Sequence, residues 1–156
     1  MNNKRILFGM IIVLAVILLT AAAISRPGPS VQYKTSNESV CTENGKPVVS
    51  MYGTTTCPHC EWVKETFDRV TKEYADRGLI VAHHWQFDLK DDLLTPNAEG
   101  AIPQAELDKY ERFNPKHTVP TFILGCKYSK VGNSFESSND TAAEEAYLRE
   151  YINKIV

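Results

Sequence analysis

The chain has 156 residues, of which 43% are hydrophobic, and a net charge of −2 at pH 7. This composition is typical of a globular protein and excludes a largely disordered chain. Positive charge is not gathered in a basic patch, so we expect no binding to nucleic acid.

The first 25 residues have the pattern of an N-terminal signal anchor. Lys4 and Arg5 precede residues 6–24, a stretch without charge that would span about 28 Å as a helix. Positive charge ahead of such a segment keeps the N-terminus in the cytoplasm. We therefore expect a single membrane helix, with the rest of the chain on the extracytoplasmic side. Residues 20–23 (TAAA) also resemble a signal-peptidase site, so a cleaved, secreted form is the alternative.

Residues 26–45 are expected to form a polar tether. Residues 25–30 (SRPGPS) cannot continue a helix, and few large apolar side chains follow up to Gly45. The remaining stretch, residues 46–156, is long enough for one hydrophobic core and too short for two domains. The sequence thus predicts one folded domain behind a tether.

The folded domain begins with a strand and a helix that meet at two cysteines. Residues 47–52 (PVVSMY) are short and mostly apolar, as expected for a buried strand. Helical spacing then gives one apolar face, made of Cys60, Val63, Phe67, Val70 and Tyr74. Pro58 suits the first helical turn and Gly78 the position after its end. Cys57 should therefore lie at a helix N-terminus.

The motif Cys57-Pro58-His59-Cys60 is a dithiol that can close into a disulfide. A helix N-terminus stabilises a thiolate, so we expect Cys57 to have a lowered pKa and to attack disulfides. Cys60 faces inward and is suited to resolving the mixed disulfide. Pro58 and His59 are expected to tune the reduction potential, because a cationic His59 would favour the thiolate.

A metal site is the alternative interpretation of two cysteines at this spacing. A full site usually needs a second pair of ligands. Cys41 and Cys126 are isolated from each other in the sequence. His83 and His84 are neighbours on a predicted strand, so they should point to opposite faces. We therefore expect no metal and no other cofactor.

The later elements complete an α/β pattern. Residues 79–87 (LIVAHHWQF) predict a second strand, parallel to the first because a helix connects them. Pro103 suits the first turn of a further helix, which carries Leu107, Tyr110 and Phe113 at helical spacing. Residues 122–125 (FILG) predict a third strand, and residues 128–135 its hairpin partner.

Residues 139–156 predict a C-terminal helix. Thr141-Ala142-Ala143-Glu144 is a capping box, and one face carries Leu148, Tyr151, Ile152 and Ile155. We expect this helix to cover one face of the sheet.

Together, the cysteine motif at a helix start, the β-α-β unit and the sequence Thr118-Val119-Pro120-Thr121 resemble the thioredoxin superfamily. The CPHC motif is similar to that of the bacterial disulfide-oxidase (DsbA-like) branch. The resemblance implies a mixed central sheet of about four strands flanked by helices, over residues 46–156. It also implies that Pro120 is cis and lies against the cysteines, and that the backbone of Val119 pairs with the substrate.

The chain departs from this resemblance in two places. Members of the superfamily carry a buried carboxylate six residues before the first cysteine, where this chain has Met51. Proton transfer to and from Cys60 should then use water or another group. The oxidase branch also has a large helical insertion, whereas residues 88–118 have room for only one or two short helices. Substrate choice is therefore not implied by the resemblance.

The inferred sheet predicts a structural disulfide between Cys41 and Cys126. If Cys57 meets Pro120, the strand that ends near Cys57 and the strand that begins near Pro120 are antiparallel neighbours, and their far ends also meet. Cys41 and Cys126 both fall at that far end. An oxidising compartment favours the bond. The alternatives are two free buried thiols, or a regulatory or electron-relay pair.

These features predict a membrane-tethered thiol-disulfide oxidoreductase that forms or exchanges disulfides in exported, cysteine-containing proteins. A membrane-bound or soluble redox partner would recycle the dithiol. One alternative is a reductase or isomerase, for example in cytochrome maturation. The other is a non-catalytic thioredoxin-like module that carries metal or binds peptides.

Overall fold

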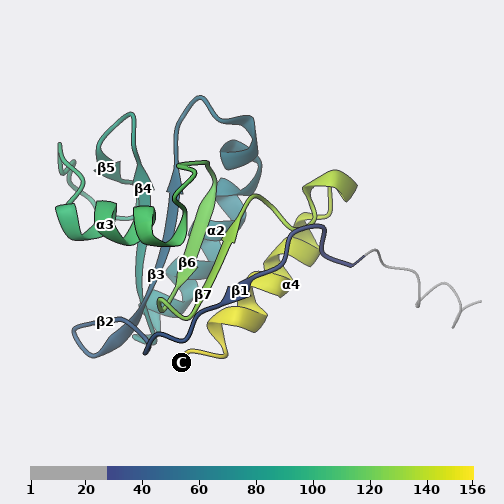
Figure 1. Ribbon diagram of the computed structural model, residues 1–156, viewed down its shortest axis with the longest axis horizontal. Coiled ribbons are helices and arrows are strands. Elements are labelled where there is room, and N and C mark those ends of the chain that lie inside the picture. Colours follow the sequence, from purple (N-terminus) through teal and green to yellow (C-terminus); the bar gives the residue numbers. More distant parts are fainter. Residues whose placement is uncertain (1–27) are drawn as a thin grey trace, which may run out of the picture.

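The computed structural model describes residues 28–156 (Figure 1). Its central strand is β3 (Lys46–Gly53), whose last six residues are buried. Strand β4 (Val81–Gln86) pairs with β3 in parallel, and strand β6 (Thr121–Leu124) pairs with it antiparallel. The predicted β-α-β unit and the antiparallel third strand are therefore confirmed.

Shorter strands extend the sheet on both sides. Strand β7 (Tyr128–Val131) pairs with β6 as the predicted hairpin, and β1 (Lys34–Thr35) pairs with β7. At the other edge β5 (Asp91–Asp92) pairs with β4, while β2 (Thr42–Glu43) pairs with the start of β3. The strand order is β1-β7-β6-β3-β4-β5, with β2 beside β3.

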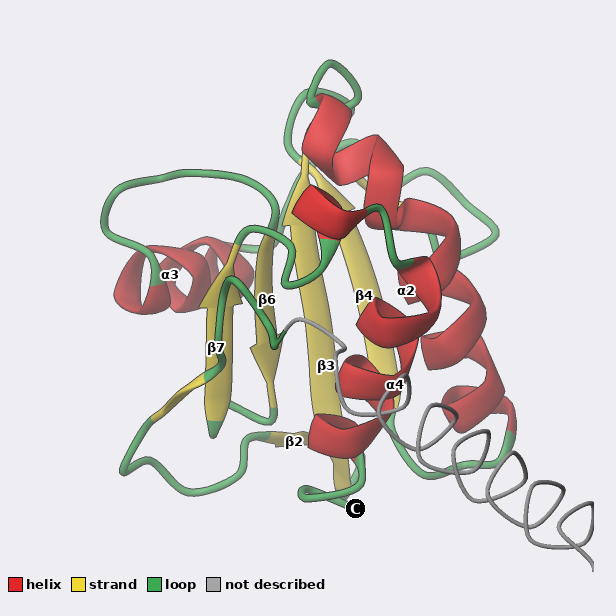
Figure 2. Ribbon diagram, turned by 90° about the vertical axis from the view of Figure 1, so that its right-hand side faces the viewer, coloured by secondary structure: helices red, strands yellow, loops and turns green. Residues whose placement is uncertain are grey.

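Helices cover both faces of the sheet (Figure 2). Helices α2 (Pro58–Asp76) and α4 (Thr141–Ile152) lie on one face, and α3 (Gln104–Phe113) lies on the other. A short 3-10 helix, η1 (Glu136–Ser138), precedes α4. The main hydrophobic core fills the space under α2 and α4, and a smaller aromatic cluster lies under α3. The molecule is a mixed α/β structure, as predicted.

Helix α2 buries the face that its apolar spacing predicts. The five residues of that face, Cys60, Val63, Phe67, Val70 and Tyr74, are all buried. Arg77 caps the C-terminal end, and Gly78 follows with a φ of +73°, a left-handed conformation that favours glycine. The helix therefore starts and ends close to Pro58 and Gly78, the residues that the sequence predicts for its two ends.

The segment before β3 differs from the predicted tether. Within residues 28–45, strands β1 and β2 pair with the sheet. The Tyr33 side chain is buried, and its ring lies 5.5 Å from Tyr147 and 4.4 Å from Tyr151 of α4. The domain thus includes residues that were predicted to belong to the tether. The sequence did not indicate this packing, because one tyrosine in a polar stretch produces no periodic pattern.

The start of α4 also differs from the prediction. Asp140 is the N-cap, and its carboxylate accepts a hydrogen bond from the Ala143 backbone N at 2.9 Å. Thr141 is the first helical residue, so the predicted capping box is wrong. Glu144 turns into the core and pairs with Lys130 of β7.

The predicted signal anchor, residues 1–25, lies outside the described residues. Over residues 28–156, no helix has both the length and the apolar character needed to cross a membrane.

Candidate functional site

The two cysteines of the CPHC motif lie at the N-terminus of α2 as free thiols. Cys57 is the N-cap residue, and its Sγ accepts a hydrogen bond from the Cys60 backbone N at 3.3 Å. An N–H group directed at the sulfur favours negative charge on it. Cys57 is half-buried, whereas Cys60 is only 2% exposed, so a substrate can reach the first sulfur more easily than the second.

The buried position of Cys60 changes its acidity. Burial, followed by the hydrogen bond with Cys57, raises the pKa of the Cys60 thiol to about 12. At neutral pH this side chain is therefore a thiol. Because only a thiolate attacks a disulfide, Cys60 would have to lose its proton before it could attack one.

The loop before β6 meets Cys57. The Val119–Pro120 peptide bond is cis, as the resemblance implies, and the Val119 carbonyl oxygen lies 3.8 Å from the Cys57 Sγ. Tyr110 Oη and Asn114 Nδ2 donate hydrogen bonds to the Thr118 carbonyl at 3.0 and 2.6 Å. The structure thus brings together the predicted residues Cys57, Val119 and Pro120, and α3 holds their loop in place.

His59 has a partner that no sequence pattern marks. Its Nδ1 lies 2.7 Å from the Glu136 Oε1 in η1. Asn133 Nδ2 donates to both the His59 carbonyl and the Glu136 Oε2, each at 2.8 Å. Glu136 therefore places a carboxylate beside the residue that was predicted to favour the Cys57 thiolate. A sequence separation of 77 residues hides this contact from the sequence.

Asp88 fixes the turn that leads into the motif. Its carboxylate accepts hydrogen bonds from the backbone N and the hydroxyl of Thr55. The hydrogen bond from the Thr55 hydroxyl lowers the pKa of Asp88. Asp88 follows β4 in the chain, so it ties this strand to the loop between β3 and α2.

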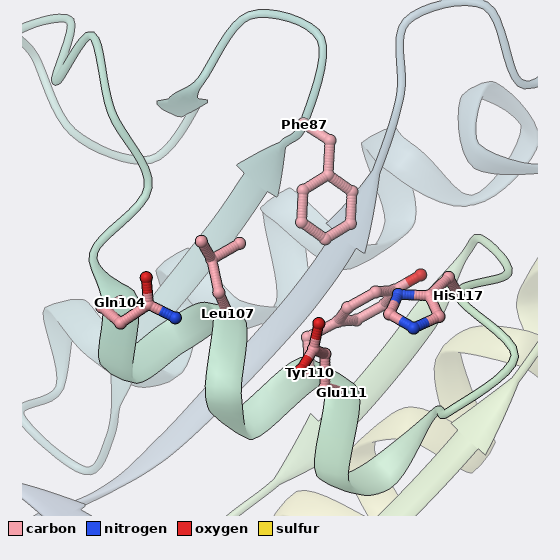
Figure 3. Close-up of a pocket in the computed structure, with 6 residues that line it drawn as sticks. All are labelled: Phe87, Gln104, Leu107, Tyr110, Glu111 and His117. Carbon is pink, nitrogen blue, oxygen red and sulfur yellow. The ribbon is translucent and has the colours of Figure 1, made fainter.

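A pocket of about 300 Å³ opens between α3 and the end of β4 (Figure 3). It is lined by Phe87, Gln104, Leu107, Tyr110, Glu111 and His117. Because the Tyr110 hydroxyl also holds Thr118, the pocket shares a residue with the anchor of the Val119 loop. Phe87, Leu107 and Tyr110 give the pocket an apolar part that suits a hydrophobic side chain.

Cys41 and Cys126 form a disulfide with a Cα–Cα separation of 5.4 Å. The Cys41 backbone N donates to the Gly125 carbonyl at 2.9 Å, and the Gly125 N donates to Val48 at 2.7 Å. The bond therefore lies at the start of β3, the opposite end from Cys57. The pairing predicted from strand directions is confirmed.

The two adjacent histidines have separate surroundings. His83 Nδ1 lies 2.7 Å from Asp92 Oδ2, and although burial lowers its pKa, hydrogen bonds with Asp92 and Glu43 raise it overall. His84 is fully buried on the other face of β4, beside Asp68 of α2. In the described part of the chain, no three His, Cys, Asp or Glu side chains are grouped to hold a metal ion.

Chemically, the arrangement offers one accessible sulfur, one buried sulfur three residues away, and the Val119 backbone carbonyl beside the first. These groups suit exchange between a dithiol and a disulfide. No protein-family model, curated protein or solved structure matches the chain.

Proposed function

We propose that the protein is a thiol-disulfide oxidoreductase with a thioredoxin-like fold, and that Cys57 and Cys60 are its redox pair. The observation that supports this most directly is the placement of Cys57 as the N-cap of α2, with the buried Cys60 behind it and the Val119 carbonyl 3.8 Å from its sulfur. A substrate chain that hydrogen-bonds to the Val119 backbone would bring its own sulfur to Cys57.

In the oxidising direction, a substrate thiolate attacks the Cys57 sulfur of the Cys57–Cys60 disulfide. That bond breaks, a mixed disulfide with Cys57 forms, and Cys60 leaves as a thiolate that takes up a proton. A second substrate thiolate then attacks the substrate sulfur of the mixed disulfide, which forms the substrate disulfide and releases Cys57 as a thiolate. Two electrons pass from the substrate to the protein, and a redox partner must remove them.

Polypeptides fit this site as substrates. The pocket between α3 and β4 has Phe87 and Leu107 in its wall and shares Tyr110 with the anchor of the Val119 loop. It would take a hydrophobic side chain near the substrate cysteine. The reaction that we propose first is the oxidation of exported proteins. Reduction or isomerisation would use the same residues with a different redox partner.

An extracytoplasmic location is part of the proposal. The Cys41–Cys126 disulfide suits an oxidising compartment, and residues 6–24 with the preceding positive charges suit a membrane anchor. Protease added to intact cells should then degrade the domain. Protection until the cells are lysed would contradict this orientation, and a soluble form beginning near residue 24 would indicate cleavage.

Turnover with a disulfide substrate tests the function. Wild-type protein with a thiol reductant should reduce insulin, and its oxidised form should form disulfides in a reduced peptide. Cys57→Ser should abolish both activities, whereas Cys60→Ser should trap mixed disulfides through Cys57. If Cys57→Ser matches the wild type, the protein is a binding module without redox chemistry at this site.

A further inference from the structure

Three polar side chains form a hydrogen-bonded chain between β4 and α2. His84 Nδ1 lies 2.6 Å from Asp68 Oδ1, and His84 Nε2 lies 2.9 Å from Gln86 Nε2. His84 is fully buried and Gln86 is 3% exposed. The Asp68 side chain is 27% exposed and lines a surface hollow beside Leu93 and Leu94. The chain thus leads from the core to solvent.

The partners of His84 fix its hydrogens. A carboxylate only accepts hydrogen bonds, so Nδ1 carries the hydrogen toward Asp68. The Gln86 amide donates its own hydrogen to Nε2, which leaves Nε2 as an acceptor. This amide orientation is assigned from the hydrogen-bond network. In this arrangement the Nε2 lone pair of His84 accepts the Gln86 amide hydrogen.

The Gln86 end of this series of hydrogen-bonded side chains lies beside Cys60. Gly53 pairs with Gln86 across β3 and β4, and a Cβ built on Gly53 would lie 3.4 Å from both the Cys60 Sγ and the Gln86 Nε2. These two atoms are therefore at most twice 3.4 Å, or 6.8 Å, apart. Within the described chain, the Gln86 Oε1 is buried without a hydrogen-bond partner. A buried acceptor without a partner costs free energy, so we expect the amide to have a second orientation in which Oε1 accepts a hydrogen bond.

Few other ionisable groups face His84. On α2 Asp68 contacts the imidazole, and on β5 Asp92 accepts a hydrogen bond from the His84 backbone N at 2.8 Å. On β3 the residue directly paired with His84 is Met51, which cannot hold a proton. The imidazole is therefore the base that a buried side chain, Gln86, connects toward Cys60.

We propose that His84 accepts the proton of Cys60 during the resolving step, with Gln86 between them and Asp68 connecting the imidazole to solvent. This inference rests on the proposed function. The Cys60 thiol gives up one proton and His84 Nε2 gains one, leaving a thiolate and an imidazolium. The thiolate attacks the Cys57 sulfur of the mixed disulfide, the Cys57–Cys60 bond forms, and the substrate leaves as a thiolate. In the reverse reaction the imidazolium returns the proton to Cys60.

The Gln86 amide links the two charged groups. Once Nε2 carries a hydrogen, it needs an acceptor, and rotation of the amide presents Oε1 to it. Because His84 acts through Gln86, it is a positioning residue rather than one that touches the substrate.

A two-phase exchange reaction tests the proposal. Reduced protein in excess is mixed with an aryl disulfide that releases a coloured thiolate, once when Cys57 attacks and again when Cys60 closes the disulfide. In the wild type, the second phase should slow in acid, because it needs an unprotonated acceptor for the Cys60 proton. His84→Gln should slow the second phase by about 100-fold, the usual scale of acid-base catalysis, and remove the acid limb while leaving the first phase unchanged.

His83→Gln is the matched control, because His83 is the adjacent residue and faces the other side of β4. It should leave both phases unchanged. If His84→Gln does not fold, Asp68→Asn tests the solvent end of the hydrogen-bonded series. Loss of the carboxylate makes the imidazolium less stable, so the acid limb should move to lower pH.

Folded His84→Gln protein with a normal second phase would overturn the inference, as would an Asp68→Asn acid limb identical to that of the wild type. Absence of the first phase in the wild type would contradict the proposed function itself. The two failures are therefore distinguishable.

Discussion

At the scale of single residues, the two cysteines differ because the start of α2 places them in different surroundings. Cys57 receives a backbone N–H at its sulfur and faces the Val119 loop, whereas Cys60 is enclosed by the core. The dithiol motif at the helix start is a local sequence feature, so the sequence predicts it. The neighbouring side chains Glu136 and Gln86 come from other elements and leave no local pattern.

The carboxylate of Glu136 should make the redox pair less oxidising. It lies beside His59 and opposes the positive charge that would favour the Cys57 thiolate. Glu136→Gln removes a negative charge near Cys57, so the reduction potential should rise by about 10–30 mV, where 30 mV corresponds to tenfold in the equilibrium constant. Equilibration with glutathione measures it. His59→Pro should move the potential in the opposite direction, and an unchanged potential in both variants would remove this pair from the mechanism.

The acidity of Cys60 should appear in the stability of the reduced protein. Its folded pKa is about 12, and a free cysteine has a pKa of about 8.5. The folded state therefore holds the proton at pH values where the unfolded chain has lost it. The stability that this provides is complete below about pH 8.5 and is lost as the pH rises toward 12.

Urea unfolding of Cys57→Ser, which cannot form the redox disulfide, measures this effect. Between pH 8.5 and 10.5 its free energy of unfolding should fall more steeply than that of Cys57→Ser/Cys60→Ala, in which residue 60 does not titrate. Parallel pH profiles would show that Cys60 is not held as a thiol by the fold.

At the scale of elements, an ion pair inside the core joins β7 to α4. Lys130 and Glu144 are 3% and 2% exposed. Glu144 also accepts hydrogen bonds from the backbone N of Ser134 at 2.7 Å and of Phe135 at 2.9 Å. Burial lowers the pKa of Lys130, and the Glu144 carboxylate partly offsets that effect. Glu144 thus holds the turn between β7 and α4 and also balances the charge of Lys130.

Removing one member of this pair should destabilise the fold strongly. Lys130→Met leaves a buried carboxylate without its cation, and we expect a loss of about 3–5 kcal/mol. Lys130→Met/Glu144→Gln should recover most of that loss, because the Gln oxygen can still accept from the two backbone N–H groups. Chemical unfolding of the two single variants and the double variant measures the coupling. Additive losses would contradict a buried, coupled pair.

The elements themselves were largely predictable, for a physical reason. Residues 47–52 and the apolar face from Cys60 to Tyr74 carry strong periodic patterns, and periodicity reflects burial on one face. The inward turn of Glu144 was not predictable, because a glutamate three residues after a threonine at a helix start is normally a cap. Its partner Lys130 lies on another element, and pairing across elements leaves no periodic signal.

At the scale of the whole molecule, the two cysteine pairs lie at opposite ends of β3, and one is a disulfide while the other has free thiols. The segment that carries Cys41 packs on the sheet through β1, β2 and Tyr33. Sequence patterns missed this packing, because the two strands have two residues each and their side chains are exposed. The disulfide was predictable, because it depends on strand directions rather than on side-chain packing.

Loss of the Cys41–Cys126 bond should affect stability and spare turnover. It closes a loop with a sequence separation of 85 residues, which corresponds to about 4.5 kcal/mol in the chain-entropy model. Cys41→Ala/Cys126→Ala should therefore melt at a clearly lower temperature and keep nearly full dithiol activity in the cold. Lost activity with unchanged melting would make this pair part of the electron path.

The reduction potential of the Cys57–Cys60 pair tests the central claim most directly. Equilibrating the protein with glutathione mixtures and measuring the fraction with free thiols should give one reversible two-electron transition. Its potential should lie between about −270 and −120 mV, the range of known exchange proteins. The transition should vanish in Cys57→Ser and persist in Cys41→Ala/Cys126→Ala. A potential below about −300 mV, as for structural disulfides, or no two-electron transition would contradict the account.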